Sequence, residues 1–184
     1  MKIWITSDTH FNHKKLVELE GRPENFNELI ISNHNKQFAP DDMLIHLGDV
    51  ILGKHATLNE FLSKFNVKHK ILVRGNHDHK PNAWYMEKGF TFVCDYFVWK
   101  DIAFSHAPLT PLPRCGQEHY KEEVKLNIHG HFHSNGHRIL PGREDAYFNA
   151  EYYTKHTNSY YLVHIEKTFR PVLLDTILAE RGLA

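Results

Sequence analysis

Residues 2–10 read Lys-Ile-Trp-Ile-Thr-Ser-Asp-Thr-His, a short β-prone run that stops at an acid. The alternation of side chains predicts a strand over Lys2–Ser7 that ends at Asp8. Asp8 and His10 then follow the carboxyl end of this strand. Because open α/β proteins place ligands at the carboxyl ends of their strands, this stretch predicts a site built on strand ends.

Four later segments repeat the arrangement of a short apolar run followed by polar side chains. These segments end in Gly48-Asp49, Gly75-Asn76-His77-Asp78, Ser105-His106 and Gly130-His131-Phe132-His133. Five such ends that carry Asp, Asn and His could converge on one site. A glycine before the polar residue allows the sharp turn that this convergence needs.

The remaining pattern is that of a mixed α/β protein, with helices covering a sheet core. Predicted helices cover 12–20, 24–38, 56–66 and 81–88, with a short helical tail from Thr176; further strands cover 43–47, 70–73, 91–94, 97–99, 102–105, 126–129, 160–165 and 171–175. The spacing of 91–105 favours antiparallel pairing, and the last two strands are spaced as a terminal hairpin. Residues 107–123, with three prolines, are predicted to form a long loop that could act as a substrate lid.

Length and composition indicate one domain over residues 1–184, long enough to bury a single core. The 22 Lys and Arg balance the 22 Asp and Glu, so no strong field attracts the chain to bulk nucleic acid or to a membrane. Two cysteines, Cys94 and Cys115, suit reduced thiols, and the short apolar start does not resemble a signal peptide. We therefore expect a cytoplasmic protein. Its oligomeric state is not encoded in any pattern that we recognise.

The chemistry that suits such residues is two-metal catalysis. Two divalent cations about 4 Å apart can clamp the attacking and leaving oxygens of a phosphoryl transfer, and a shared carboxylate offsets their repulsion. Each residue also has a simpler interpretation. An Asp at a strand end often caps a helix or a turn, and 16 histidines could be scattered over the surface.

The motifs Asp8-x-His10, Gly48-Asp49, Gly75-Asn76-His77-Asp78, His106 and Gly130-His131-x-His133 match, in full and in order, the pattern DxH…GD…GNH(D/E)…H…GHxH. The chain thereby resembles the calcineurin-like metallophosphoesterase family, and most of all its small stand-alone bacterial and phage members. The resemblance implies a four-layer αββα sandwich of two mixed β-sheets flanked by helices. It also implies a dinuclear-metal phosphoric ester hydrolase.

The same resemblance implies a role for each matched residue. Asp8, His10 and His133 would hold one metal, and Asn76, His106 and His131 the other. Asp49 would bridge both metals. His77 would lie beside the phosphate as general acid or transition-state stabiliser, and Asp78 would orient it. Mn²⁺ is the metal that the family favours, with Fe, Zn, Ni and Co as alternatives.

The substrate implied is a small phosphorylated molecule, with nucleotides among the candidates. Asn76, His77, Asn12 and His13 would contact it, although Asn12 and His13 could equally begin a helix. The apparent lack of room for a cap domain favours a phosphodiester or a cyclic nucleotide over a monoester. Two alternatives stay open: a catalytically silent protein-binding scaffold on the same fold, and a His-rich metal carrier.

Overall fold

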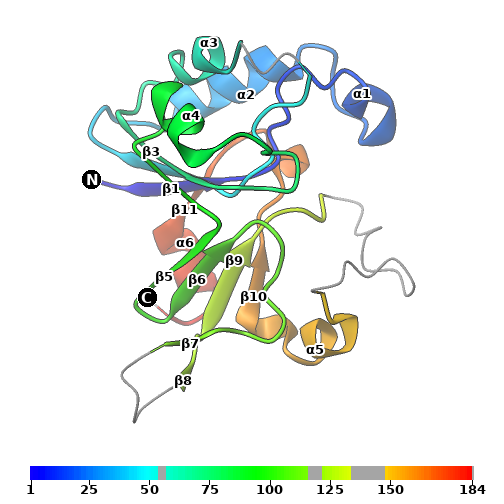
Figure 1. The fold of residues 1–184 in the computed structure, drawn as a ribbon, viewed down its shortest axis with the longest axis vertical. Coiled ribbons are helices and arrows are strands. Elements are labelled where there is room, and N and C mark those ends of the chain that lie inside the picture. The colour runs from blue at the N-terminus through cyan, green and yellow to red at the C-terminus, as the bar shows by residue number, and fades with distance from the viewer. Residues whose placement is uncertain (54–56, 116–121, 134–147, 184) are drawn as a thin grey trace.

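The computed structural model describes residues 1–53, 57–115, 122–133 and 148–183. Its first sheet has the strand order β11-β1-β2-β3-β4 (Figure 1). The strands are β1 (Ile3–Thr6), β2 (Met43–His46), β3 (His69–Val73), β4 (Phe92–Cys94) and β11 (Val172–Leu173). Strands β1 to β4 are parallel, and β11 is antiparallel to β1, so the sheet is mixed.

The second sheet has the order β10-β9-β6-β5 and faces the first. Its strands are β5 (Tyr96–Trp99), β6 (Ile102–Ser105), β9 (Leu126–His129) and β10 (Tyr160–Leu162). Only β5 is antiparallel, so this sheet is mixed too. A separate two-stranded ribbon joins β7 (Arg114–Cys115) to β8 (Glu122–Glu123).

Helices form the outer layers of the molecule. Figure 1 shows α1 to α4 over the outer face of the first sheet, α5 beneath the second sheet, and α6 beside both. Their bounds are α1 Leu16–Leu19, α2 Phe26–Asn35, α3 Leu58–Leu62, α4 Asn82–Glu87, α5 Ala150–Lys155 and α6 Leu174–Glu180. Within the described ranges, none of these helices is long and apolar enough to cross a membrane.

The alternation of side chains along each strand separates two main cores. In β1, Trp4 packs under the helices, whereas Ile5 packs between the two sheets. Phe104 and Ile128 enter the core between the sheets from β6 and β9. Because both faces of the first sheet are covered, its strands are mostly apolar, as expected for buried parallel strands.

The predicted fold class is confirmed: two mixed sheets with flanking helices. The predicted terminal hairpin is wrong, because β10 pairs with β9 in the second sheet and β11 with β1 in the first. A 3₁₀ turn over Ile165–Lys167 separates these two strands. Antiparallel pairing holds for β5 and β6 only, since β4 pairs in parallel with β3 in the other sheet. Proximity in sequence gave no information about which sheet each strand would join.

Part of the segment 107–123, which was predicted to form a substrate lid, packs against the second sheet. Leu112 and Val124 are buried with Tyr160 against the outer face of the second sheet, and Leu109 packs with them. Residues 116–121 of that segment lie outside the described ranges. The helices are also shorter than predicted, with α1 beginning at Leu16 rather than at residue 12.

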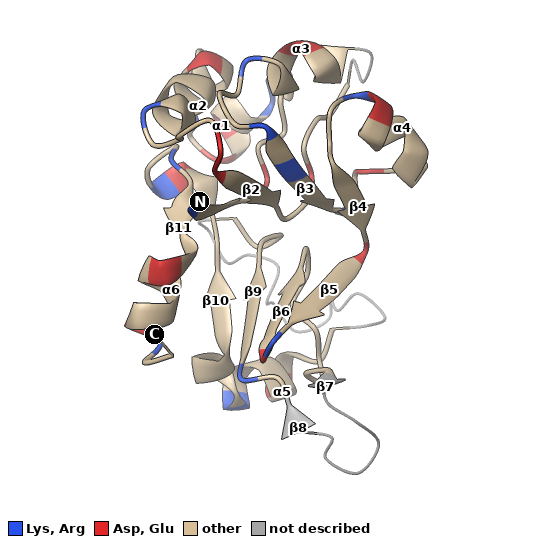
Figure 2. Cartoon of the chain, turned by 90° about the vertical axis from the view of Figure 1, so that its left-hand side faces the viewer, with Lys and Arg blue, Asp and Glu red and all other residues tan. Residues whose placement is uncertain are grey.

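Charges of both signs are interspersed over the described elements (Figure 2). This distribution agrees with the balanced composition.

Candidate metal centre

The seven predicted ligands follow the carboxyl ends of five strands, three in the first sheet and two in the second. Five of them have a positive φ: Asp8 (52°), His10 (45°), Asp49 (56°), His131 (72°) and His133 (51°). This backbone conformation is unfavourable for residues with a side chain, and each instance costs on the order of 1–3 kcal/mol. Strain of this kind persists where surrounding contacts enforce it, and it concentrates at functional sites.

Two glycines allow the loops to approach one another. A Cβ on Gly130 would lie 1.8 Å from Ser7 Oγ and 2.5 Å from Asp8 Oδ2. A Cβ on Gly75 would lie 2.1 Å from Asp49 Oδ1. The glycines that precede the Asn76 and His131 motifs therefore provide the space in which the two carboxylates sit.

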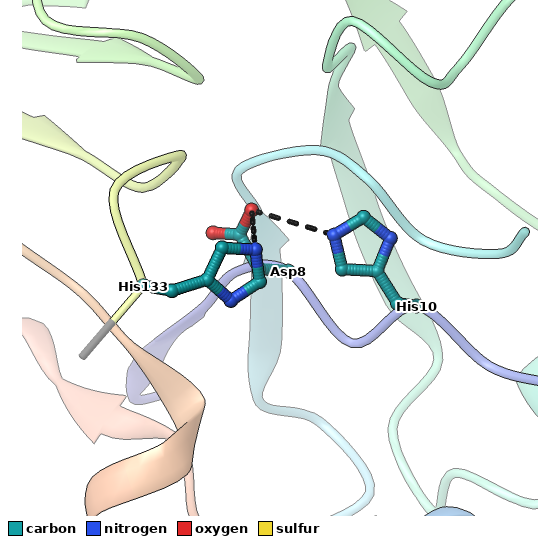
Figure 3. Close-up of side chains that lie close together, drawn as sticks. All are labelled: Asp8, His10 and His133. Carbon is teal, nitrogen blue, oxygen red and sulfur yellow. Dashed lines mark ion pairs between the residues drawn. The ribbon is translucent and has the colours of Figure 1, made fainter. Parts of the chain in front are cut away.

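The first group of side chains consists of Asp8, His10 and His133, all buried (Figure 3). Asp8 Oδ1 lies 3.9 Å from His10 Nε2 and 3.7 Å from His133 Nε2. The other carboxylate oxygen, Oδ2, accepts hydrogen bonds from Ser7 Oγ and from the backbone N–H of His131. Asp8 thus presents one oxygen to the two imidazoles while the protein holds the other.

The second group consists of Asp49, His106 and His131, with Asn76 at its edge. His106 Nε2 lies 3.0 Å from both Asn76 Oδ1 and His131 Nδ1. Its other nitrogen, Nδ1, donates to the carbonyl of Leu47 at 2.7 Å, so Nε2 is left to face the group. The structure thus brings together all seven predicted side chains.

Asp49 stands between the two groups. Its Oδ2 lies 3.5 Å from His10 Nε2 in the first group and 3.4 Å from His106 Nε2 in the second. Its Oδ1 accepts the backbone N–H of His77 at 2.8 Å. One oxygen within reach of both groups is the arrangement that a carboxylate bridge between two cations requires.

The donor set fits divalent cations. Among the described residues, Asp8 Oδ1 is buried and has no hydrogen-bond partner, although it lies at the centre of the first group. A buried acceptor without a partner costs roughly 1–3 kcal/mol, which a bound cation would recover. The ligand atoms are imidazole nitrogens and carboxylate or amide oxygens, which suit Mn, Fe, Co, Ni or Zn.

The electrostatics also favour positive charge at this position. Burial disfavours a charged His106, but the charge and hydrogen bond of Asp49 outweigh burial and raise the pKa of His106 to about 9. Burial would likewise raise the pKa of Asp49, yet His106 and His10 lower it well below its usual value. For His10, burial dominates and lowers the pKa well below 6.5, which leaves a neutral imidazole able to ligate.

His77 lies at the rim of the two groups. Its ring centroid is 5.5 Å from that of His10, and its Nε2 is 4.0 Å from Asp49 Oδ2. Its side chain is 33% exposed, whereas the ligand histidines are almost fully covered. His77 is therefore the imidazole that a substrate could reach from solvent.

Asp78 is placed differently from its predicted role as the residue that orients His77. Its carboxylate accepts the backbone N–H groups of Asp49, Val50 and Gly75 at 2.7–3.3 Å. Burial, followed by the charge of Asp49, raises its pKa to about 6. Asp78 joins the loop after β2 to the loop after β3, and none of its described hydrogen bonds reaches the His77 ring.

The two residues predicted to contact substrate from the first loop differ in their contacts. Asn12 donates to Thr57 Oγ1 and accepts from Asn27, so its side chain is used to hold the loop. His13 has its ring 5.7 Å from that of His10, and its buried Nδ1 has no partner among the described residues. Of the two, His13 is the one whose ring faces the site.

Two other polar side chains, which directly precede Gly75 and Gly130, have structural partners. Arg74 pairs with Asp95, and buried His129 contacts the carbonyl of Gly130 and the hydroxyl of Tyr153.

Two further residues, which no sequence pattern had indicated, contact the site. Arg22 is buried and donates to the backbone carbonyls of Asp8 and Thr9. Glu166 accepts from Arg22 and contacts His133 Nδ1 at 2.8 Å. Burial alone would raise the pKa of Glu166, but the His133 hydrogen bond and the Arg22 charge lower it to about 2. No motif contains either residue, and 144 positions separate them.

Comparison with solved structures shows which proteins have a similar fold. A solved structure of a protein of unknown function from Aquifex aeolicus superposes with a TM-score of 0.71 at 25% identity, over 97% of this chain and 98% of that one. A nuclease from Pseudomonas putida aligns with a TM-score of 0.48 at 20% identity, over 71% and 61% of the two chains. The latter likeness is too low to bear on fold or function.

Sequence comparison identifies the family. An uncharacterized protein of Methanocaldococcus jannaschii is 37% identical over 83 residues, 42% of this chain and 47% of that protein. The match thus spans about half the length of this curated relative. The sequence profile of the calcineurin-like phosphoesterase superfamily domain matches residues 1–166. Because that match covers most of the 184 residues, the chain belongs to the calcineurin-like phosphoesterase superfamily.

Proposed function

We propose that this protein hydrolyses phosphate esters at a centre of two divalent cations. Membership of the superfamily supports a metal-dependent phosphoesterase in general. The observation that carries the two-cation proposal is the position of Asp49 Oδ2, within 3.5 Å of an imidazole nitrogen of each group. A mononuclear site would have no need of a carboxylate oxygen shared in this way.

Asp8, His10 and His133 would hold one cation, and Asn76, His106 and His131 the other, with Asp49 common to both. The cations would supply Lewis-acid activation of water and of the phosphoryl group. The site offers nitrogen and oxygen ligands without sulfur, which suit Mn, Fe, Zn, Ni or Co, and Mn²⁺ is our first choice because the family resemblance points to it.

His77 is proposed as the general acid. The backbone N–H of His77 donates to Asp49 Oδ1, which holds the His77 backbone next to the proposed cation site. The ring of His77 stays accessible to solvent. The ring would donate a proton to the leaving alkoxide. Asp78 would support this step indirectly, since its carboxylate ties the Gly75 turn to the loop of Asp49.

The substrate we propose is a small phosphodiester or cyclic nucleotide. Asn76 is exposed and His77 partly exposed, so the rim is open to a phosphate with a substituent on either side. Asn76, His77 and His13 would line the phosphate. Asn12 would act mainly by holding the loop, given its bonds to Asn27 and Thr57.

We also propose that the protein resides in a reducing compartment such as the cytoplasm. Cys94 is a free thiol, and burial raises its pKa to about 11, so it is protonated at neutral pH. The side chain of Cys115 lies outside the described part of the structure.

The decisive experiment is a substrate panel on metal-free protein reloaded with Mn²⁺. The panel contains bis-p-nitrophenyl phosphate, p-nitrophenyl phosphate and a cyclic nucleotide. Turnover should require Mn²⁺, should favour the diesters, and should be lost in Asp49→Asn. Wild-type protein that binds two cations yet turns over no ester would contradict the proposal and leave a scaffold or a metal carrier. Faster turnover of the monoester would correct the substrate class alone.

A further inference from the structure

The pair formed by Arg22 and Glu166 contacts the first metal group from behind. Arg22 is 2% exposed and lies in the connection between α1 and α2. Its Nη1 donates to the Thr9 carbonyl at 2.8 Å, and its Nη2 to the Asp8 carbonyl at 2.7 Å. These two carbonyls belong to the loop in which Asp8 and His10 have positive φ. The hydrogen bonds from Arg22 thus offset part of the conformational cost of this loop.

Glu166 joins this guanidinium to a predicted ligand. Its Oε1 accepts from Arg22 Nε at 3.1 Å and from Nη2, and it lies 2.8 Å from His133 Nδ1. An ionised carboxylate only accepts hydrogen bonds, so the proton of His133 is on Nδ1. Nε2 of His133 is thereby the ring nitrogen that faces the first group, 3.7 Å from Asp8 Oδ1.

These contacts close a ring through Asp8. The backbone carbonyl of Asp8 binds Arg22, Arg22 binds Glu166, Glu166 binds His133, and His133 faces the Asp8 carboxylate. The ring connects the first loop of the chain to the 3₁₀ turn that follows β10. Two ligands of one group are therefore held relative to each other by a single buried ion pair.

We propose that Arg22 and Glu166 are positioning residues for the cation held by Asp8, His10 and His133. Glu20, His133 and Glu166 also approach one another closely enough to suggest a third cation site. The guanidinium already lies against Glu166 and supplies the positive charge there, so positioning is the role that the contacts favour. The inference rests on the proposed function only in requiring a cation at the first group.

The test is calorimetric titration of metal-free protein with Mn²⁺. In Glu166→Ala, the affinity for one of the two cations should fall by roughly 10–100-fold, because the orientation of a ligand histidine is lost. The affinity for the other should stay within about twofold, because the hydrogen bonds of Glu166 go to His133 and Arg22, behind the first group. Glu166→Gln should recover most of the loss, since its amide oxygen can still accept from His133 and Arg22.

The matched control is Asp95→Ala. Asp95 also pairs with an arginine beside a ligand loop, Arg74, but contacts no predicted ligand. Its removal should leave both affinities unchanged. If Glu166→Ala folds poorly, Arg22→Lys replaces it, because a lysine keeps the charge but cannot span three acceptors.

The proposal is overturned if Glu166→Ala binds both cations as the wild type does. It is equally overturned if both affinities fall together, or if Glu166→Gln behaves like Glu166→Ala. Wild-type protein that shows these selective losses but hydrolyses no ester would end the proposed hydrolysis and leave the positioning role intact.

Discussion

At the scale of single residues, the candidate site is built from side chains in costly conformations. Asp8, His10, Asp49, His131 and His133 all have positive φ. Buried hydrogen bonds to Asp8 and Asp49 leave their remaining oxygens directed at imidazoles. Partly exposed side chains at the rim of the groups are free to act on a substrate, and His77 is the foremost of these.

His77→Ala should lower kcat by roughly 10²–10⁴ if the ring is the general acid. Metal content should stay at the wild-type value, because His77 lies at the rim. Steady-state kinetics on a diester, together with metal counting by mass spectrometry, checks both expectations. His79→Ala is the matched control, since His79 is an exposed neighbouring imidazole. A fully active His77→Ala would remove this role.

Gly130→Ala should disrupt cation binding. The new Cβ would overlap Ser7 Oγ and Asp8 Oδ2, and overpacking of this kind costs about 1–3 kcal/mol. Thermal unfolding and Mn²⁺ titration measure the two effects. Gly182→Ala is the comparison, because nothing lies within 4 Å of a Cβ there and only its positive φ is strained. Normal cation binding by Gly130→Ala would show that the loops can move apart.

At the scale of elements, buried histidines join the helices to the strand that begins the site. His34 in α2 donates from Nδ1 to the carbonyl of Ile30 and contacts Thr6 Oγ1 of β1 with Nε2. His46 at the end of β2 contacts Thr9 Oγ1 in the same way, in the loop of Asp8 and His10. Burial lowers the pKa of both imidazoles to about 3, so they are neutral in the folded protein and these contacts are sensitive to acid.

The stability of the metal-free protein should fall between pH 7 and pH 5, partly through His34. Burial lowers the pKa of His34 from 6.5 to about 3. The unfolded chain therefore gains a proton below pH 6.5 that the folded chain does not accept until about pH 3. This difference removes about 2 kcal/mol of unfolding free energy from pH 7 to pH 5. Urea unfolding in chelator should show a shallower decline for His34→Gln, and an unchanged decline would contradict the assignment.

At the scale of the whole molecule, the site belongs to neither sheet alone. Loops after β1, β2 and β3 supply Asp8, His10, Asp49 and Asn76, and loops after β6 and β9 supply the remaining histidines. The core of Ile5, Val73, Phe104 and Ile128 between the sheets therefore sets the separation of the ligands. That residues 1–184 form a single domain stays a prediction.

Divalent cations should stabilise the whole fold, because they join loops from both sheets. At a free Mn²⁺ concentration of 100 times Kd, each bound cation contributes about 2.7 kcal/mol. For a chain of this size, that corresponds to a rise in Tm of roughly 5–10 °C. Differential scanning calorimetry with Mn²⁺ and then with chelator measures it. Asp49→Asn should show little of the rise, and an equal rise in that variant would place the cations elsewhere.

The mixed α/β class, most strands and the seven side chains that converge could be predicted from the amino-acid sequence, and the resemblance to a known family added the two-sheet sandwich. These depend on local signals: apolar runs of strand length, glycines before polar residues, and the order of five motifs.

Three features depend on how the folded chain packs. They are the sheet that each of the last strands joins, the binding of Asp78 to backbone N–H groups instead of the His77 ring, and the ion pair of Arg22 and Glu166 beside His133. The reason is the separation in sequence between the residues that interact. A strand or a turn is specified by neighbours in sequence, whereas the partner of a buried charge 144 positions away is fixed only by how the two sheets pack.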